Sequence, residues 1–127
     1  MTTLEDELLN VSVKLLQSID AGDWATYAQL CDERITCFEP ETEGHLVAGL
    51  PFHKFYFDLP GAATPRQSTV SSPHIRVVGD VGIVCYARVV QKLAADGVPV
   101  TVVADETRIW QRVDGAWKHI HFHRSPR

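Results

Sequence analysis

The chain has 127 residues and a mass of 14.2 kDa, the usual size of one domain, so we expect a single domain over residues 1–127. Its formal charge of −4 gives no reason to expect a nucleic acid or an anionic membrane as a partner, because both attract clustered Lys and Arg. No apolar run approaches the roughly 20 residues of a membrane span, and the N-terminus is acidic where a signal peptide is basic, so the sequence predicts a cytoplasmic protein.

Two helices are predicted at the start of the chain. Apolar residues recur at helical spacing and mark one stripe of the first helix: Leu4, Leu8, Val11, Leu15 and Ile19. Thr2 and Glu5 fit a capping box at its start, and Gly22 fits the left-handed residue after its end. Asp23 is then placed to cap a second helix over residues 24–31.

The next segment mixes short elements. Residues 35–38 and 46–48 are predicted to form strands, and residues 49–57 a third helix. In that helix His53 and Tyr56 lie one turn apart and are expected to face the mouth of a pocket, and the aromatic residues Phe52 and Phe55 are expected to pack inward. A loop follows at Pro60, Gly61, Ala62, Ala63 and Pro65.

Beyond the loop the hydrophobic period changes to two. Four strands are predicted, at residues 67–78, 81–93, 100–113 and 116–124, and each turn between them contains Asp and Gly. Helices followed by a long antiparallel meander indicate an α+β fold in which the helices cover one face of a strongly curved, mostly antiparallel sheet. Such a sheet commonly encloses a cavity and covers its other surfaces by association with a second copy.

Three arginines fall on the apolar side of these strands. Alternation along a strand places Arg88, Arg108 and Arg124 on the same face as large apolar neighbours such as Tyr86 and Phe122. A guanidinium on an apolar face is costly unless a cavity, water or carboxylates receive it. Either the arginines form an anion-receptive pocket, or they neutralise internal acids such as Glu106 and Glu39 and bind nothing.

Other polar residues give weaker signals. His119, His121 and His123 alternate, so we expect all three on the face opposite Arg124, in a subunit contact whose assembly depends on pH. We predict no metal site, because residues i and i+4 of a strand lie about 13 Å apart and three histidines could not share one ion. The three tryptophans (Trp24, Trp110, Trp117) and the cysteines (Cys31, Cys37, Cys85) are interpreted as core residues, and no cofactor is expected.

Motifs in a fixed order cover nearly the whole chain. They are Gly22-Asp23, Cys31-Asp32, Phe38-Glu39-Pro40-Glu41, the run Gly49 to Phe57, Pro73-His74-Ile75, Glu106-Thr107-Arg108-Ile109-Trp110, Asp114-Gly115-Ala116-Trp117 and His121-Phe122-His123-Arg124-Ser125. From Glu5 to Ser125 the chain resembles the association, or hub, domain of calcium/calmodulin-dependent protein kinase II. The resemblance implies a nuclear transport factor 2-like cone, shared with ketosteroid isomerases and SnoaL-like cyclases, that forms a homodimer or a larger ring.

The resemblance also implies the site. In the kinase hub the arginines matching Arg88, Arg108 and Arg124, with a histidine matching His53, line a pocket that takes small acidic molecules or acidic peptide segments. We add Tyr56 and Glu106 to this predicted pocket. A tryptophan of the family pocket has no counterpart in the shortened loop 59–65, so the ligand does not carry over.

Catalysis is the less favoured alternative. The chain lacks the Gly-rich loop, the His-Arg-Asp loop and the Asp-Phe-Gly triplet of protein kinases, so a stand-alone oligomerising module without kinase activity is predicted. A SnoaL-like isomerase, cyclase or hydrolase would need a base near neutrality, which His53 or Glu106 could supply if burial shifts its pKa suitably. Nothing in the sequence matches the acidic base of ketosteroid isomerase.

Overall fold

The computed structural model describes residues 2–61 and 64–127 and opens with two helices. Helix α1 (Leu4–Asp20) is capped by Thr3, whose side chain accepts from the backbone N–H of Asp6 while Asp6 reciprocates. The predicted capping box is therefore wrong by one residue, because Thr3 is the last extended residue before the helix. Gly22 has a φ of 67°, as predicted, and Asp23 caps helix α2 (Trp24–Leu30).

Six strands form one sheet in the order β2-β1-β6-β5-β4-β3. Their bounds are β1 (Cys31–Phe38), β2 (Val47–Ala48), β3 (Arg66–Val78), β4 (Val81–Leu93), β5 (Pro99–Val113) and β6 (Ala116–Pro126). Among the strands of the described residues only the β1–β6 pair is parallel, so the first long strand lies beside the last one. The predicted α+β fold with a mostly antiparallel sheet is confirmed.

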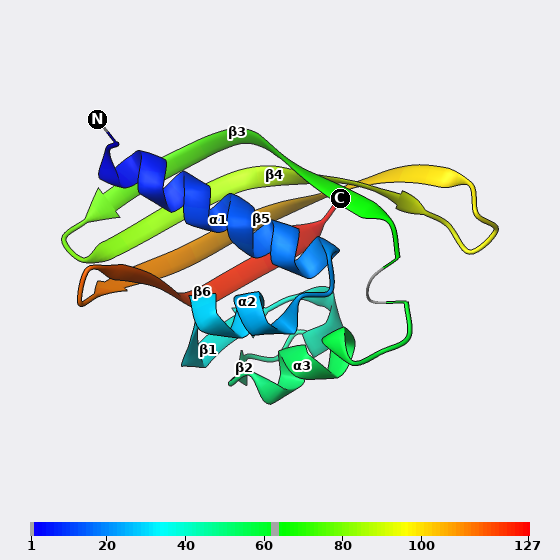
Figure 1. Ribbon diagram of the computed structural model, residues 1–127, viewed down its shortest axis with the longest axis horizontal. Coiled ribbons are helices and arrows are strands. Elements are labelled where there is room, and N and C mark those ends of the chain that lie inside the picture. The colour runs from blue at the N-terminus through cyan, green and yellow to red at the C-terminus, as the bar shows by residue number, and fades with distance from the viewer. Residues whose placement is uncertain (1, 62–63) are drawn as a thin grey trace.

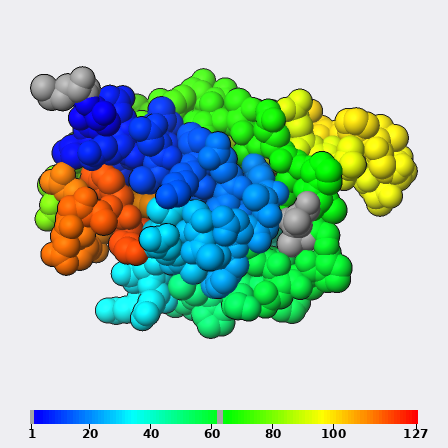
Figure 2. Space-filling view, viewed as in Figure 1, coloured from blue at the N-terminus to red at the C-terminus, as the bar shows by residue number. Residues whose placement is uncertain are grey.

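The helices cover one face of the sheet. Figure 1 shows α1 lying across the long strands, with α2 and α3 (Pro51–Phe57) grouped at the β1–β2 side, and the space-filling view in Figure 2 shows these helices on the near face of the molecule. A close approach between α1 and β4 requires Gly82, because a Cβ there would overlap the side chain of Leu8. Trp110 and Trp117 are buried beneath the helices and Trp24 is partly buried against the same core, as predicted. Cys31 and Cys37 are buried in that core too, but the core prediction is wrong for Cys85, which is half-buried because strand alternation places it on the opposite face of β4. No helix of the described chain is long and apolar enough to cross a membrane.

A β-bulge in β6 changes which histidines face the core. Ile109 pairs with His121 but Trp110 pairs with His119, so Ile120 is an extra residue in the ladder. The bulge reverses the alternation and turns His119 inward, where it is 0% exposed. His121 is half-buried and His123 is exposed. The prediction that all three histidines share one outer face is therefore wrong for His119.

Helix α3 presents a different aromatic side from the one predicted. Pro51 starts the helix, His53 is buried, and Phe57 packs on α2 with its ring 4.9 Å from that of Tyr27. Phe55 is 60% exposed, so the prediction that it packs inward is wrong: the core-facing stripe of this short helix passes through His53 and Phe57. Of the predicted loop before β3, Ala62 and Ala63 lie outside the described residues.

Candidate functional site

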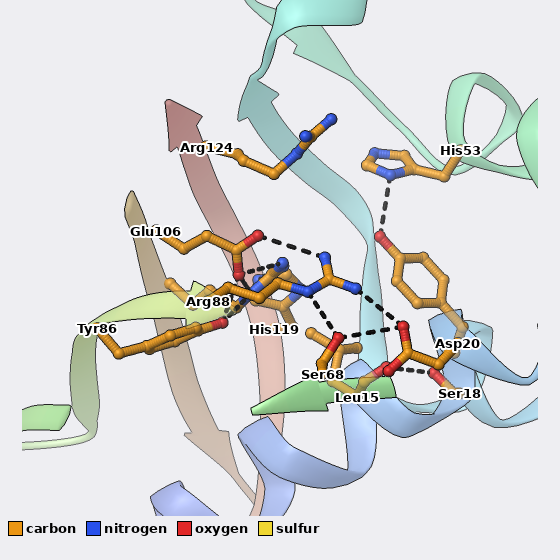
Figure 3. Close-up of polar contacts among 12 residues, drawn as sticks. Leu15, Ser18, Asp20, His53, Ser68, Tyr86, Arg88, Glu106, His119 and Arg124 are labelled. Carbon is orange, nitrogen blue, oxygen red and sulfur yellow. Dashed lines mark hydrogen bonds and ion pairs between the residues drawn. The ribbon is translucent and has the colours of Figure 1, made fainter. Parts of the chain in front are cut away.

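A cavity of about 330 Å³ opens between the inner face of the sheet, α2, α3 and the C-terminal end of α1. Five of the six predicted pocket residues line it: His53, Tyr56, Arg88, Arg108 and Arg124. The sixth, Glu106, is not part of the lining. It lies behind the arginines and bonds to them (Figure 3).

The base of the cavity is a closed ion-pair network. Arg108 donates from Nη2 to Glu106 Oε1 at 3.0 Å and from Nε to the hydroxyl of Tyr86 at 2.8 Å. Tyr86 in turn donates to Glu106 Oε1 at 2.6 Å. Burial alone would raise the pKa of Glu106, but Arg108, Arg88 and the Tyr86 hydroxyl outweigh it and lower that pKa. Glu106 is thus a fixed counter-ion and not a base poised near neutrality.

His119 lies next to Arg108 at the base of the cavity, but it is not part of the lining. Its Nε2 lies 3.5 Å from Arg108 Nη1, and its Nδ1 lies 3.5 Å from the sulfur of Cys31. Its ring also stacks on Phe122, over which the Arg108 guanidinium sits at 4.6 Å. Burial, and then the charge of Arg108, lower the pKa of His119 far below its ordinary value. The imidazole is neutral, so Nε2 accepts from Arg108.

Arg88 links the sheet to the first helix. It donates from Nε to Ser68 Oγ at 2.9 Å, from Nη2 to Asp20 Oδ1 at 3.2 Å and from Nη1 to Glu106 Oε2 at 3.4 Å. Ser68 also donates to Asp20, at 3.1 Å. In Figure 3 the Arg88 guanidinium lies between the two carboxylates. The last residue of α1 is therefore tied to strands β3, β4 and β5.

The mouth of the cavity is built differently. Arg124 Nη2 donates to both oxygens of Glu41, at 2.7 and 2.6 Å, and Glu41 belongs to the single 3₁₀ turn Pro40–Thr42 between β1 and β2. Glu39 also lines the cavity. Burial, and then the neighbouring Glu41 carboxylate, raise the pKa of Glu39 to about 7. Glu41 has a lowered pKa, since hydrogen bonds and Arg124 outweigh its own burial.

His53 stands between the base and the mouth. Its Nδ1 lies 2.9 Å from the hydroxyl of Tyr27, and its Nε2 lies 3.9 Å from the sulfur of Cys37. Burial, and then Arg108, lower the pKa of His53 to about 4, so the ring is neutral at pH 7. Burial thus shifts this pKa away from neutrality, in the direction opposite to what the predicted catalytic base requires.

The cavity carries a small excess of positive charge. Its lining holds Arg66, Arg88, Lys92, Arg108 and Arg124. Against these five stand four carboxylates, Glu39 and Glu41 in the lining and Asp20 and Glu106 behind it, which leaves one positive charge when all four are ionised. Arg88, Arg108 and Arg124 each have a carboxylate partner, as the neutralisation hypothesis expects, but Arg124 uses Glu41 and not Glu39.

Sequence reasoning missed Asp20, Glu41 and Lys92 as members of this site. Asp20 follows the apolar stripe of α1 and offers no signal, since its role depends on where the helix end docks against β3 and β4. Glu41 could have been found beside Glu39 in the motif Phe38-Glu39-Pro40-Glu41. Lys92 shares the even parity of Arg88 along β4, so the same alternation predicts its face. Within the described residues no group of three metal ligands gathers.

Comparison with known proteins identifies this architecture. The family model of the calcium/calmodulin dependent protein kinase II association domain matches residues 4–127. The rabbit (Oryctolagus cuniculus) calcium/calmodulin-dependent protein kinase type II subunit delta is 39% identical over 135 residues, which cover 98% of this chain. The chain spans only about a quarter of that subunit's length, 25%.

Solved structures agree with the family model. The hub homology domain from Chlamydomonas reinhardtii is 46% identical, with a TM-score of 0.91 and 98% of each chain covered. The hub from S. rosetta is 39% identical, with a TM-score of 0.88, covering 100% of this chain and 99% of that one. An NTF2-like protein from Cytophaga hutchinsonii is 18% identical, with a TM-score of 0.81 over 98% of this chain and 99% of its own, and shows the shared fold alone. This chain belongs to the calcium/calmodulin-dependent protein kinase II association domain family.

Proposed function

We propose that this chain is a self-associating module that packs against a second copy of itself through the outer face of its sheet. Membership of an association domain family supports this role. No kinase chemistry is included in the proposal, since the arginines and carboxylates of the cavity are engaged with one another and the sequence has none of the kinase motifs.

The observation that carries the proposal is an apolar strip along the outward side of β4. Alternate residues of β4 are buried under the helices, so the others point to the opposite face, where no described helix covers them. These outward residues are small or aliphatic and only half-buried: Val81, Ile83, Cys85, Ala87 and Val89. Ile83 stands opposite Ile109 of β5. A half-buried aliphatic strip along β4, continued at Ile109 and Val103 of β5, favours burial against a matching surface.

A charge in the centre of this strip tests the proposal. We expect wild type to scatter light as a dimer or larger ring at micromolar concentration, and Ile83→Glu to shift it toward the monomer, because the interface would then have to bury a carboxylate in place of an aliphatic side chain. Leu46→Glu is the matched control, since Leu46 is 56% exposed in the segment before β2. A wild-type chain that stays monomeric, or an Ile83→Glu chain with unchanged mass, would contradict the proposal.

A second function, binding of a small carboxylate in the cavity, is supported by the excess cationic charge. The volume of about 330 Å³ suits a small molecule, and His53, Phe57 and Phe122 give the cavity apolar walls beside its guanidinium groups. Ligands that bind the folded state raise its melting temperature. We therefore expect butyrate, but not butylamine, to raise the Tm, and Arg124→Gln to abolish the effect. Equal shifts for the two ligands would contradict it.

A further inference from the structure

Arg124 already holds a carboxylate in the cavity, and this carboxylate belongs to the chain itself. Only one nitrogen of the guanidinium, Nη2, serves Glu41, and it serves both oxygens. A fork-to-fork pair would use two nitrogens. Among the described residues the other guanidinium nitrogens of Arg124, Nε and Nη1, make no hydrogen bond. Arg124 therefore binds Glu41 through Nη2 alone, and its Nε and Nη1 groups can still donate to a second anion.

The ion pair between Arg124 and Glu41 is also partly exposed to solvent, so it can separate. The side chains of Arg124 and Glu41 are 25% and 35% exposed, whereas those of Arg108 and Glu106 are 2% and 0% exposed. Water can therefore solvate either partner of the mouth pair when it separates. Glu41 stands in one 3₁₀ turn, followed by the exposed residues Glu43 and Gly44 at positive φ. A rotation of its side chain disturbs no strand of the sheet.

We propose that Glu41 is an internal competitor for the carboxylate site: a small monocarboxylate binds by displacing Glu41 from Arg124. This inference rests on the proposed carboxylate binding and states how that binding is controlled. The ligand's carboxylate forms the same contact with Arg124 that Glu41 makes. The net free energy of binding is therefore only the difference between two similar ion pairs. Affinity in wild type is correspondingly low, and a neutral side chain at position 41 raises it.

Displacement of Glu41 from Arg124 is also coupled to uptake of a proton by the Glu39 and Glu41 carboxylates. Glu39 and Glu41 both line the cavity, and the charge of Glu41 favours a proton on Glu39, because two neighbouring carboxylates repel each other when both are ionised. Once Glu41 loses Arg124, the pair binds a proton from solvent more tightly, so carboxylate binding is coupled to proton uptake. The other titratable groups that face Glu39 come from β1, α2, α3, β5 and β6: Cys37, Tyr27, Tyr56, Arg108 and Arg124.

The test is calorimetric titration of the full chain with butyrate at pH 7. Glu41→Gln is expected to bind about 1.4- to fivefold more tightly than wild type, the range that corresponds to the roughly 0.2–1 kcal/mol of a partly exposed ion pair. Glu43→Gln is the matched control, because it removes the same charge directly after the turn, at an exposed residue outside the cavity lining. Arg124→Gln should remove binding in every background.

The titrations distinguish competition by Glu41 from carboxylate binding itself. If wild type binds butyrate and Glu41→Gln binds no more tightly than Glu43→Gln, the internal competitor is refuted and carboxylate binding stands. If neither wild type nor Glu41→Gln binds, carboxylate binding itself fails. A second readout is proton uptake, measured in two buffers of different ionisation enthalpy. Wild type should take up protons on binding and Glu39→Gln should take up none, and equal uptake by the two would overturn the coupling.

Discussion

Two arginine–carboxylate clusters lie in one cavity. They consist of the same residue types but differ in solvent exposure and in the number of hydrogen bonds that they make. At the base, Arg108 and Glu106 are nearly inaccessible, and each makes several hydrogen bonds to the other and to Tyr86. At the mouth, Arg124 and Glu41 meet through one nitrogen and remain partly in water. The same pair of residue types is therefore a structural element at one end of the cavity and an exchangeable contact at the other.

Desolvation explains the difference. An ion that is removed from water loses several kcal/mol of hydration, which only a complete set of partners offsets. The base supplies that set, so neither charge there can leave without stranding the other. At the mouth water replaces a lost partner at small cost. The base consequently fixes the fold around the cavity, and the mouth is where a ligand can compete.

The largest expected effect comes from removing the carboxylate at the base. Glu106→Gln leaves Arg108 and Arg88 beside a neutral amide, and breaking a buried pair in this way costs about 3–5 kcal/mol of unfolding free energy. Urea denaturation followed by circular dichroism measures the loss. Glu41→Gln is the matched change at the mouth and should cost less than about 1 kcal/mol. Equal losses in the two variants would remove the distinction between the clusters.

Acid should act on His53 and Glu39 in opposite directions. His53 has a folded pKa of about 4 against an ordinary 6.5, so its contribution to stability is complete above pH 6.5 and is lost as the pH falls toward 4. The loss approaches about 3 kcal/mol for a shift of this size. Glu39, with its raised pKa of about 7, stabilises the fold increasingly as the pH falls from 7 to 4.5.

Two variants separate these contributions. His53→Gln should flatten the decline in unfolding free energy between pH 6.5 and 4.5, and Glu39→Gln should steepen it. Urea midpoints at half-unit pH steps provide the measurement. A His53→Gln curve parallel to that of wild type would mean that the imidazole takes up its proton in the folded state, contrary to a neutral ring held by Tyr27.

The base of this site was largely predictable from sequence, and the mouth was not. Alternation places Arg88 and Arg108 inward because β4 and β5 are regular antiparallel strands with one face under helices. It also places Glu106 on that face, although it could not show that Glu106 lies behind the arginines and outside the lining. In regular strands parity fixes the face of each side chain, so the inward direction of these three residues follows from the sequence, whereas their contacts with Asp20 and His119 do not.

The irregular elements defeated the same reasoning. The bulge at Ile120 has no clear sequence signal, and it moved His119 from the predicted outer face into the core. Arg124 follows the bulge and still shares a face with Phe122, so its inward position was predicted correctly. The carboxylate partner of Arg124 lies in the 3₁₀ turn Pro40–Thr42, outside the strands. Strand alternation cannot predict which way a side chain points there. Glu39 was therefore expected where Glu41 is found.

The smallest expected effect is the coupling across the mouth itself. A double-mutant cycle of Glu41→Gln and Arg124→Gln should give an interaction energy of about 0.2–1 kcal/mol, because both side chains are partly solvated. Raising the salt from about 0.1 to 1 M shortens the Debye length from about 10 to 3 Å and should remove most of this coupling. The loss caused by Glu106→Gln should hardly change over the same range, since water and ions do not reach the buried base. A mouth coupling that resists salt would mean that Glu41 is locked onto Arg124, and a carboxylate could then not displace it.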